Sequence, residues 1–301
     1  MNETREVESK EFYPPQAIAI ATTTFYPDWY VGETRDPDHT DKIRGDLFIK
    51  LMEEVLQKGY QLSVVDGGSS PELIKLIKGL GVNIIEQDKK GMSASRRQAF
   101  IEAGGLNGAR VICWTEPEKV SLVKDCLPQA AAPILNGEAD VVVPKRDEEA
   151  FKTYPAFQVS YEKRANLLWN KLLRSKGLLS GDQELDVFFG PKFLANTPKV
   201  LNLFLRKFHY AKSESQLDRK VDPERWANTT FLPVVAALQE GLRVVSVTVP
   251  YRHPQIQLEN ERDSKEFREK REEQLRDIIV STIHFLRLSE KSPRSKLSEA
   301  E

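Results

Sequence analysis

The chain has 301 residues, with 40% hydrophobic and 30% charged side chains. This is the composition of an ordinary globular protein, so the collagen-like, coiled-coil and wholly disordered classes are excluded. Its 44 lysines and arginines balance 45 aspartates and glutamates, for a formal net charge of −1. That balance gives no electrostatic reason to expect nucleic acid or an anionic membrane as a partner.

Cysteine usage and the start of the chain indicate a compartment. The two cysteines, Cys113 and Cys126, favour a reducing environment without a disulfide framework or a cysteine metal site. The first ten residues are polar and acidic and have no apolar core of the kind a signal peptide needs. No apolar run approaches the length of a membrane span, so we expect a cytoplasmic protein without a transmembrane segment.

The first half of the chain alternates strand-like and helix-like segments. The apolar patterns predict strands over 17–24, 61–65, 82–86, 109–114 and 139–143, and helices over 43–58, from 71, over 93–103 and over 120–135. Such alternation with short connections is typical of βαβ units and a mostly parallel sheet. Right-handed crossovers then bring the carboxyl ends of the strands to one edge, where open α/β sheets bind ligands.

The second half has a different pattern. It predicts helices over 161–174, 231–239 and 264–288, strands over 185–189 and 243–249, and a polar loop over 213–225. Several familiar signatures are missing from the whole chain. No Gly-x-Gly-x-x-Gly follows the first strand, and there is no Walker A, His-Glu-x-x-His or Gly-x-Ser-x-Gly motif.

A first candidate constellation follows the second predicted strand, in the run Asp66-Gly67-Gly68-Ser69-Ser70. A carboxylate there can accept hydrogen bonds from a nucleobase or a ribose hydroxyl, and the glycines let a ligand approach the backbone. The same residues are also ordinary choices for a strand-to-helix turn.

A second constellation, Glu116-Pro117-Glu118, follows the fourth predicted strand. Two carboxylates at a strand end suit a hard divalent cation that keeps waters and binds phosphate oxygens, although a solvated turn would use the same residues. A third, Arg252-His253, follows the last predicted strand. There His253 could supply a metal ligand and Arg252 could contact phosphate, while a lone histidine is also commonly structural.

The order of these features resembles the nucleotide-binding half of GT-A fold glycosyltransferases, in particular the family-2-like group. The stretch with Asp66 and Gly67 is similar to the family segment that contacts base and ribose. The stretch 91–99, Gly-Met-Ser-Ala-Ser-Arg-Arg-Gln-Ala, resembles the family element Gly-x-x-x-Ala-Arg-Asn-x-Gly, with Arg96 in the arginine position. Thr22 and Thr23 stand where the family places a nucleotide-contacting turn.

The resemblance also implies a metal centre. Glu116 and Glu118 fall at the family's Asp-x-Asp metal motif, and His253 falls at its late histidine near the metal and diphosphate. The implied cofactor is Mg²⁺ or Mn²⁺. The implied partners are a nucleotide-diphospho-sugar donor and an unknown hydroxyl acceptor.

The chain departs from the family in its carboxylates. Glutamate replaces aspartate at both metal positions, and the run 226–230, Trp-Ala-Asn-Thr-Thr, has no carboxylate where inverting members carry their general base. Asp182 and Asp186 are then the candidate bases of an inverting reaction. A retaining reaction, in which the leaving phosphate assists, needs no such base. Trp226 and the loop 213–225 are candidates for the acceptor side.

We therefore expect an α/β, GT-A type fold: a mostly parallel Rossmann-like sheet flanked by helices, with an acceptor-binding second half. The expected activity is transfer of a sugar, a hexose by preference, from a nucleotide-diphospho-sugar to a hydroxyl. The alternatives are a nucleotidyltransferase of the same sheet topology and a non-catalytic nucleotide-sugar-binding relative. The expected division is a polar tail over 1–15, one domain over 16–288 (nucleotide-sugar half 16–145, acceptor half 146–262, C-terminal helix 263–288) and a disordered tail over 289–301.

Overall fold

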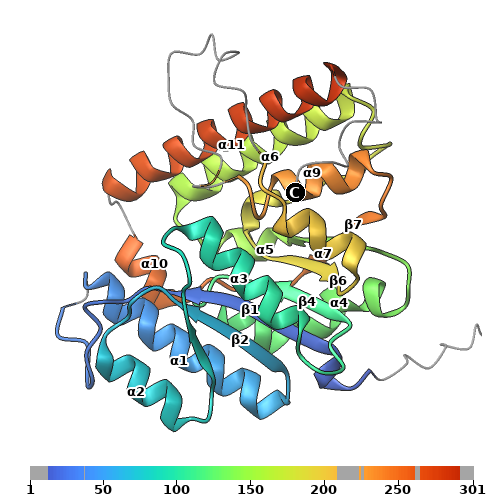
Figure 1. The fold of residues 1–301 in the computed structure, drawn as a ribbon. Coiled ribbons are helices and arrows are strands. Elements are labelled where there is room, and N and C mark those ends of the chain that lie inside the picture. Colours follow the sequence, from blue (N-terminus) through green and yellow to red (C-terminus); the bar gives the residue numbers. More distant parts are fainter. Residues whose placement is uncertain (1–12, 37, 209–223, 225–226, 262–264, 292–301) are drawn as a thin grey trace, which may run out of the picture.

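The computed structural model describes residues 13–36, 38–208, 224, 227–261 and 265–291. A seven-stranded sheet with the order β3-β2-β1-β4-β6-β5-β7 forms its centre (Figure 1). The strands are β1 Ile18–Thr24, β2 Gln61–Asp66, β3 Ile84–Glu86, β4 Val111–Trp114, β5 Val141–Arg146, β6 Lys192–Ala195 and β7 Val244–Val249.

Strand direction places the ligand edge. β1 pairs in parallel with β2 and β4, β2 pairs in parallel with β3, and β5 pairs in parallel with β7. Among the described strands only β6 is antiparallel, to both β4 and β5. The carboxyl ends of the other six therefore lie at one edge, where β6 begins.

Helices cover both faces of the sheet. They are α1 Thr40–Lys58, α2 Pro71–Gly79, α3 Met92–Gly104, α4 Leu127–Leu135, α5 Glu148–Phe151, α6 Ala156–Ser175, α7 Pro198–Leu205, α9 Leu232–Gln239, α10 Gln255–Glu261 and α11 Lys265–Lys291. Alternation along β1 explains the two layers, since successive strand side chains point to opposite faces. Ile18 and Ile20 pack in the cluster with α1, α2 and α4, while Ala19 and Ala21 pack in the cluster with α3, α6, α7 and α9.

Local chemistry fixes the element boundaries as the sequence predicts. The hydroxyl of Ser70 caps α2, which has Pro71 at its first position. Gly59 ends α1 in the left-handed conformation, at φ 71°. The predicted helix over 120–135 is divided, because a π-helical turn over Leu122–Cys126 precedes α4.

One predicted strand is wrong, and one observed strand was not predicted. The run 185–189 forms a 3₁₀ turn over Val187–Phe189, and the strand β6 follows it after Gly190-Pro191. The apolar residues Val187 and Phe189 are buried without joining the sheet. Burial in a short apolar run does not distinguish a strand from a buried turn, which explains the error.

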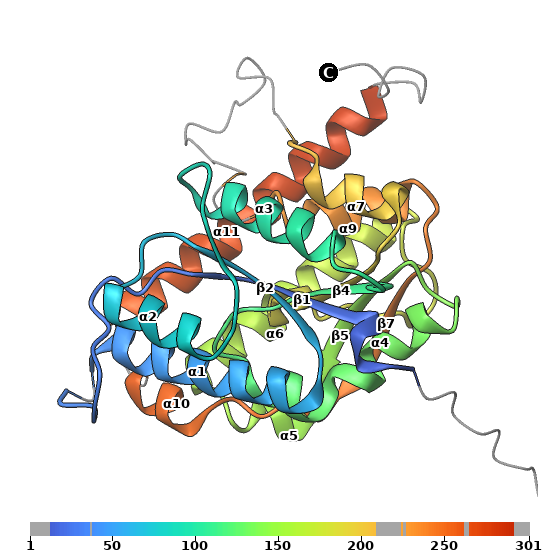
Figure 2. The ribbon, with the colours of Figure 1, turned by 60° about the horizontal axis from the view of Figure 1, so that its bottom comes forward.

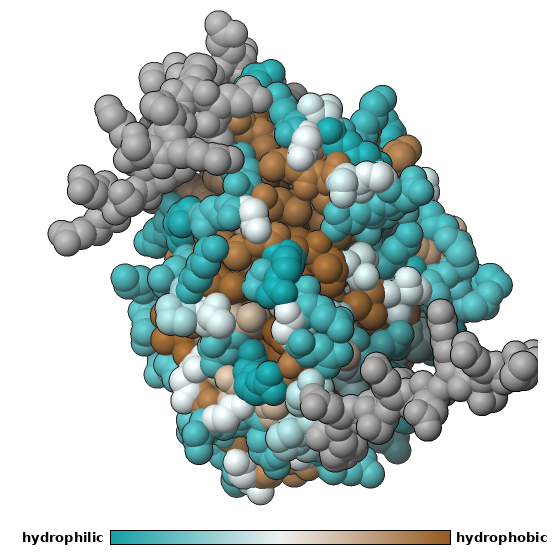
Figure 3. Space-filling model, turned by 90° about the vertical axis from the view of Figure 1, so that its right-hand side faces the viewer, coloured by the Kyte–Doolittle hydropathy of each residue, from teal (hydrophilic) through white to brown (hydrophobic). Residues whose placement is uncertain are grey.

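The last helix, α11, lies along α6 (Figures 1 and 2). The indole N–H of Trp169 on α6 donates to the hydroxyl of Thr282 on α11 at 3.1 Å, inside the core. In the described part of the chain, no helix combines the length and the apolar character that crossing a membrane requires. Figure 3 views the side where β7 forms the sheet edge, and hydrophobic residues gather there between hydrophilic ones.

Candidate active site

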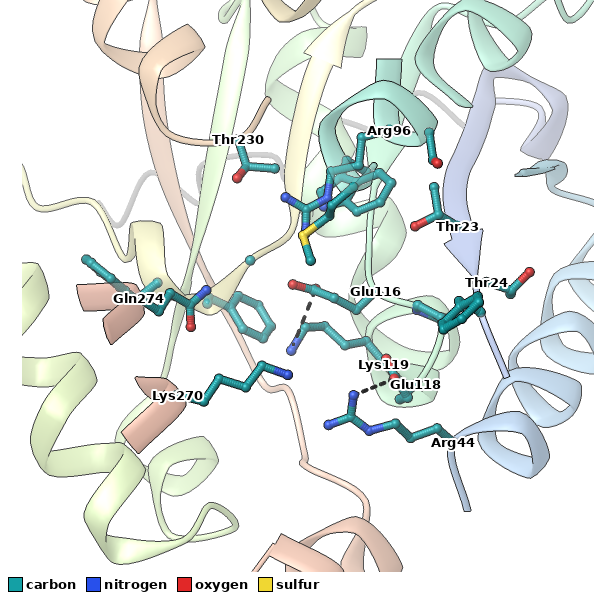
Figure 4. Close-up of a pocket in the computed structure, with 18 of the residues that line it drawn as sticks. Thr23, Thr24, Arg44, Arg96, Glu116, Glu118, Lys119, Thr230, Lys270 and Gln274 are labelled. Atoms are coloured by element: carbon teal, nitrogen blue, oxygen red, sulfur yellow. Dashed lines mark ion pairs between the residues drawn. The ribbon is translucent and has the colours of Figure 1, made fainter. Parts of the chain in front are cut away.

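A cavity of about 670 Å³ opens at the carboxyl edge of the sheet. One side, which we call the strand-end wall, consists of residues 23–26 at the end of β1 and 116–119 after β4. The opposite side, the helix wall, consists of Phe267, Lys270, Arg271 and Gln274 on α11. Figure 4 shows Lys270 and Gln274 reaching from the helix towards the glutamates of the strand-end wall.

Glu116 lies near the centre of the cavity, directly after β4. The backbone N–H of Thr115 continues the ladder by donating to the Ala21 carbonyl at 3.2 Å, which fixes the chain just before Glu116. The Oε2 atom of Glu116 is buried and has no hydrogen-bond partner, and its ion pair with Nζ of Lys119 is long at 3.9 Å. This carboxylate therefore retains accepting capacity for a ligand.

Glu118 is more tightly held. Its Oε1 accepts from the Tyr26 hydroxyl at 3.3 Å and lies 3.6 Å from the Arg44 guanidinium. Arg44 also binds Glu261 on α10 at 3.0 Å. Burial would lower the pKa of Arg44, but the carboxylates of Glu118 and Glu261 hold it above its ordinary value.

His253 follows β7 and faces the same cavity. Its ring stacks on Tyr154 with centroids 4.3 Å apart, and its backbone N–H donates to the Thr153 hydroxyl. Neither ring nitrogen has a hydrogen-bond partner, and Nε2 lies 3.9 Å from Glu261. Burial lowers the pKa of His253 to about 3, so the imidazole is neutral at pH 7 and offers a lone pair.

These side chains have the chemistry of a metal site that a substrate would complete. No three His, Cys, Asp or Glu side chains among the described residues are grouped closely enough to hold an ion by themselves. Mg²⁺ usually needs only one or two carboxylates, because substrate phosphates and water supply the remaining ligands. The lone pairs of His253 and Glu116 that have no hydrogen-bond partner, together with Glu118, fit a cation bound in that way.

The aspartate of the first constellation supports a turn. Its four hydrogen bonds come from the hydroxyls of Thr24 and Ser69, at 2.7 and 2.5 Å, and from the N–H groups of Gly68 and Ser69, at 2.8 and 2.9 Å. Asp66 therefore holds the turn, and the neighbouring Gly67 lines the cavity in its place. Of the two interpretations that the sequence left open for Asp66, a ligand contact or a structural turn, its hydrogen bonds fit the turn.

Two of the threonines at the end of β1 also differ, since one faces the cavity and the other is structural. Thr23 lines the cavity, whereas Thr22 is buried and its hydroxyl donates to the Thr115 carbonyl at 2.9 Å. Thr22 thus joins β1 to the segment that carries Glu116.

Arg96 reaches the cavity as the sequence predicts. Its guanidinium lies 5.0 Å from the centre of the Trp114 ring, and burial lowers its pKa to about 10 despite the opposing effect of Glu116. It therefore stays charged at neutral pH. The adjacent Arg97 has another partner, because it binds both oxygens of Glu224 at 2.8 and 2.6 Å.

Asp186 does not reach the cavity, and this corrects the sequence prediction of a catalytic base. Its two oxygens accept from Arg146 Nε and Nη2 at 2.8 and 2.9 Å, and Asn166 donates to it at 2.6 Å. Burial would raise the pKa of Asp186, but Arg146 holds it below its usual value. A carboxylate in this arrangement is a poor proton acceptor.

Asp182 and Arg252 also lie outside the cavity lining. Asp182 is an exposed residue of the turn that precedes the 3₁₀ turn Val187–Phe189. Arg252 is exposed and pairs with Asp147 at 3.2 Å, outside the cavity. Trp226 and most of the predicted acceptor loop, 213–223 and 225, lie outside the described residues.

The sequence interpretation named Arg96 but missed the other cations of the cavity. Arg44, Lys90, Arg96, Lys119, Arg146, Lys270 and Arg271 line it, against the carboxylates of Glu116, Glu118 and Glu162. A signal for the helix wall was present, since residues 267, 270, 271 and 274 share one face of a helix. Burial lowers the pKa of Lys270, and the neighbouring charges of Arg44 and Arg271 lower it further.

No family model matches the sequence, and no curated protein matches it either. Among solved structures, the fold is similar to glucosyl-3-phosphoglycerate synthase from Mycobacterium tuberculosis in complex with Mn²⁺, UDP and glucosyl-3-phosphoglycerate. That match has a TM-score of 0.55 and 12% identity, and covers 95% of this chain and 84% of that chain. The complex of that enzyme with Mn²⁺, UDP-glucose and phosphoglyceric acid matches with a TM-score of 0.52, 11% identity and coverage of 95% and 84%.

These likenesses establish the fold. The chain has the GT-A architecture that the sequence predicts, a mostly parallel sheet flanked by helices, as in those glycosyltransferases.

Proposed function

We propose that this protein transfers a sugar from a nucleoside-diphospho-sugar to a hydroxyl group of an acceptor, with a divalent cation on the diphosphate. The observation that carries the proposal is the convergence of Glu116, Glu118 and His253 on one cavity at the carboxyl edge of a GT-A sheet. Similar structures hold UDP-glucose and Mn²⁺.

The donor would lie along the strand-end wall. Thr23 and Gly67 would face the nucleoside, because they line the cavity at the ends of β1 and β2. Arg96 and Lys119 would be the fixed cations beside the diphosphate, where charge accumulates as the glycosidic bond breaks. Glu118 and His253 are the candidate ligands of the cation, with Glu116 beside them, and the cation would neutralise the leaving group.

The described carboxylates favour retention of configuration. Glu162 lines the cavity but binds Arg146 at 2.6 Å and accepts from Gln158 at 2.8 Å, and Asp186 is held as described above. In a retaining transfer the bond from the sugar carbon to the phosphate oxygen breaks. The acceptor oxygen bonds to that carbon on the same face, and its proton passes to the departing phosphate.

The helix wall suits an acceptor that carries a phosphate or carboxylate. Neither Lys270 nor Arg271 forms an ion pair with a described residue, although both face the cavity. An anionic group would relieve the mutual repulsion of these cations. The similar synthase has been solved in complex with both UDP-glucose and phosphoglyceric acid.

A transfer assay with UDP-, GDP- and ADP-sugars, Mn²⁺, and glycerol or phosphoglycerate as acceptors tests this proposal. We expect product with one nucleotide and loss of activity in the double variant Glu116→Gln/Glu118→Gln. The matched control is Glu53→Gln/Glu102→Gln, which removes two exposed carboxylates outside the cavity. Equal activity of the two double variants would contradict the metal role.

Two outcomes would support the alternatives. Release of pyrophosphate from a nucleoside triphosphate would indicate a nucleotidyltransferase. Tight calorimetric binding of a nucleoside diphosphate with Mn²⁺, without turnover of any sugar nucleotide, would indicate a non-catalytic relative.

A further inference from the structure

We propose that Gly190 is a positioning residue, because the carboxylate of Glu116 packs against its Cα atom, which carries no side chain. The buried Lys192 holds Gly190 in place. The functional part of this inference rests on the proposed function. A Cβ atom placed on Gly190 would lie 2.3 Å from Oε1, 2.6 Å from Oε2 and 2.8 Å from Cδ of Glu116. Any side chain at position 190 therefore has to displace the carboxylate.

The sheet register explains why these two residues meet. In the antiparallel pair of β4 and β6, Trp114 lies opposite Lys192. Two residues beyond each end of this pair, the same register places Glu116 opposite Gly190. The backbone at Gly190 has φ +101°, a conformation that side chains rarely adopt, so glycine serves both the turn and the contact.

Lys192 ties the segment before β6 into one conformation. Its ammonium group is fully buried and donates to three backbone carbonyls, those of Val187, Gly190 and Pro191, at 3.0, 2.9 and 3.2 Å. In its protonated form the lysine has three N–H groups, and this set satisfies all of them. The ammonium therefore holds the 3₁₀ turn, Gly190 and the start of β6 together.

The contact controls a buried acceptor atom of the strand-end wall that has no hydrogen-bond partner. Oε2 of Glu116 is buried without such a partner, and Lys119 is 3.9 Å away. Lacking other hydrogen bonds, this carboxylate depends on packing against Gly190 for its position. Moving it by an ångström would change what it offers to a bound sugar nucleotide, although the sheet would be unaltered.

The experiment compares Gly190→Ala with Gly32→Ala. Gly32 has almost the same φ, +100°, and no atom within 4 Å of its ideal Cβ, so it reproduces the backbone strain without the contact. We measure the melting temperature of each variant and the Kd of UDP with Mn²⁺ by calorimetry. We expect Gly190→Ala to weaken UDP binding at least tenfold, and Gly32→Ala to change it less than twofold.

A double-mutant cycle with Glu116→Ala isolates the pair. In the Glu116→Ala background, Gly190→Ala is expected to cause no further loss of UDP affinity and only the melting-temperature loss of Gly32→Ala. Additive losses in the cycle would overturn the inference. The same holds if Gly190→Ala alone leaves UDP affinity unchanged.

The two readouts separate this inference from the proposed function. If the parent protein binds no nucleotide, the proposed function fails, and the inferred role in ligand binding fails with it. The melting-temperature cycle still decides whether Gly190 positions Glu116. Lys192→Met is expected to weaken UDP binding in the same direction as Gly190→Ala, and normal affinity in that variant would exclude the role of Lys192.

Discussion

The two walls of the cavity treat charge in opposite ways. On the strand-end wall, Glu118 meets Arg44 and Tyr26 within the protein, and the Glu116 carboxylate packs against Gly190. On the helix wall, Lys270 and Arg271 face the cavity without an ion pair to a described residue. The register of the sheet positions the groups of the strand-end wall. The charges of the helix wall lie on α11, the last described helix.

This difference indicates how the two walls act. Groups already held by protein partners cost little reorganisation when a ligand arrives, which is the property of a preorganised centre. Unpaired cations repel each other until an anion binds, so they favour ligand binding over stability of the free protein. The comparison predicts that substitutions on the two walls have separable effects.

The largest effect is expected at the strand-end wall. Glu118→Gln should weaken Mn²⁺-dependent UDP binding about 100-fold, because it removes a candidate cation ligand and the partner of Arg44. Calorimetry with Mn²⁺ and with EDTA measures the change. An equal loss in EDTA would show that Glu118 acts on the nucleotide without the cation.

A smaller and different effect is expected at the helix wall. Lys270→Gln/Arg271→Gln should raise the KM for a phosphorylated acceptor about 10- to 100-fold, since bonds to charged groups contribute about 1.5–3 kcal/mol. UDP affinity should change less than twofold. Lys265→Gln/Arg276→Gln, on exposed positions of the same helix, is the control. A comparable loss of UDP affinity would show that the helix wall also binds the nucleotide, and would contradict separate roles for the two walls.

A third prediction concerns Lys192, the buried lysine behind the strand-end wall. Burial lowers the pKa of Lys192 to about 7, although Glu116 and Asp186 oppose this. The unfolded chain, with a lysine pKa of about 10.4, binds a proton that the folded chain has released between these values. The contribution of Lys192 to the free energy of unfolding should therefore rise with pH above 7, by about 1 kcal/mol per pH unit.

Urea unfolding at pH 7.5 and 9 measures this dependence, with Lys192→Met as the reference. The difference in unfolding free energy between the parent and the variant should grow towards pH 9. Parallel pH dependences would show that the Lys192 ammonium stays charged.

The smallest effect is expected at Arg252. Its exposed ion pair with Asp147 should contribute less than about 1 kcal/mol, and Arg252→Ala should leave UDP affinity within twofold. A large loss of UDP binding would restore the phosphate contact that the sequence predicts, and would extend the strand-end wall to the end of β7.

The comparison also explains what the sequence could predict. Glu116, Glu118 and His253 follow strands, and the carboxyl ends of parallel strands share an edge, so local patterns were enough to bring them together. The role of Asp66 could not be decided in this way, because a turn and a ligand use the same lone pairs. Pairing of Asp186 with Arg146, 40 residues away, has no local signature.

The helix wall required information that periodicity does not contain. The stripe on α11 predicts a packed helix, but the packing partner, α6, and the approach to the strand ends depend on tertiary structure. The strand β6 is short and antiparallel, and it follows a Gly-Pro that indicates only a break.

β6 is antiparallel to both of its neighbours. Among the described strands, it is therefore the only one that the chain enters from the ligand edge of the sheet. The loops that lead into the other described strands lie on the remote side of the sheet and contribute no residue to the cavity lining. Insertions or deletions just before residue 192 would instead remodel the cavity floor while every strand kept its place. Among the connections that lead into the described strands, that short one is therefore the place where a change in loop length would alter the cavity.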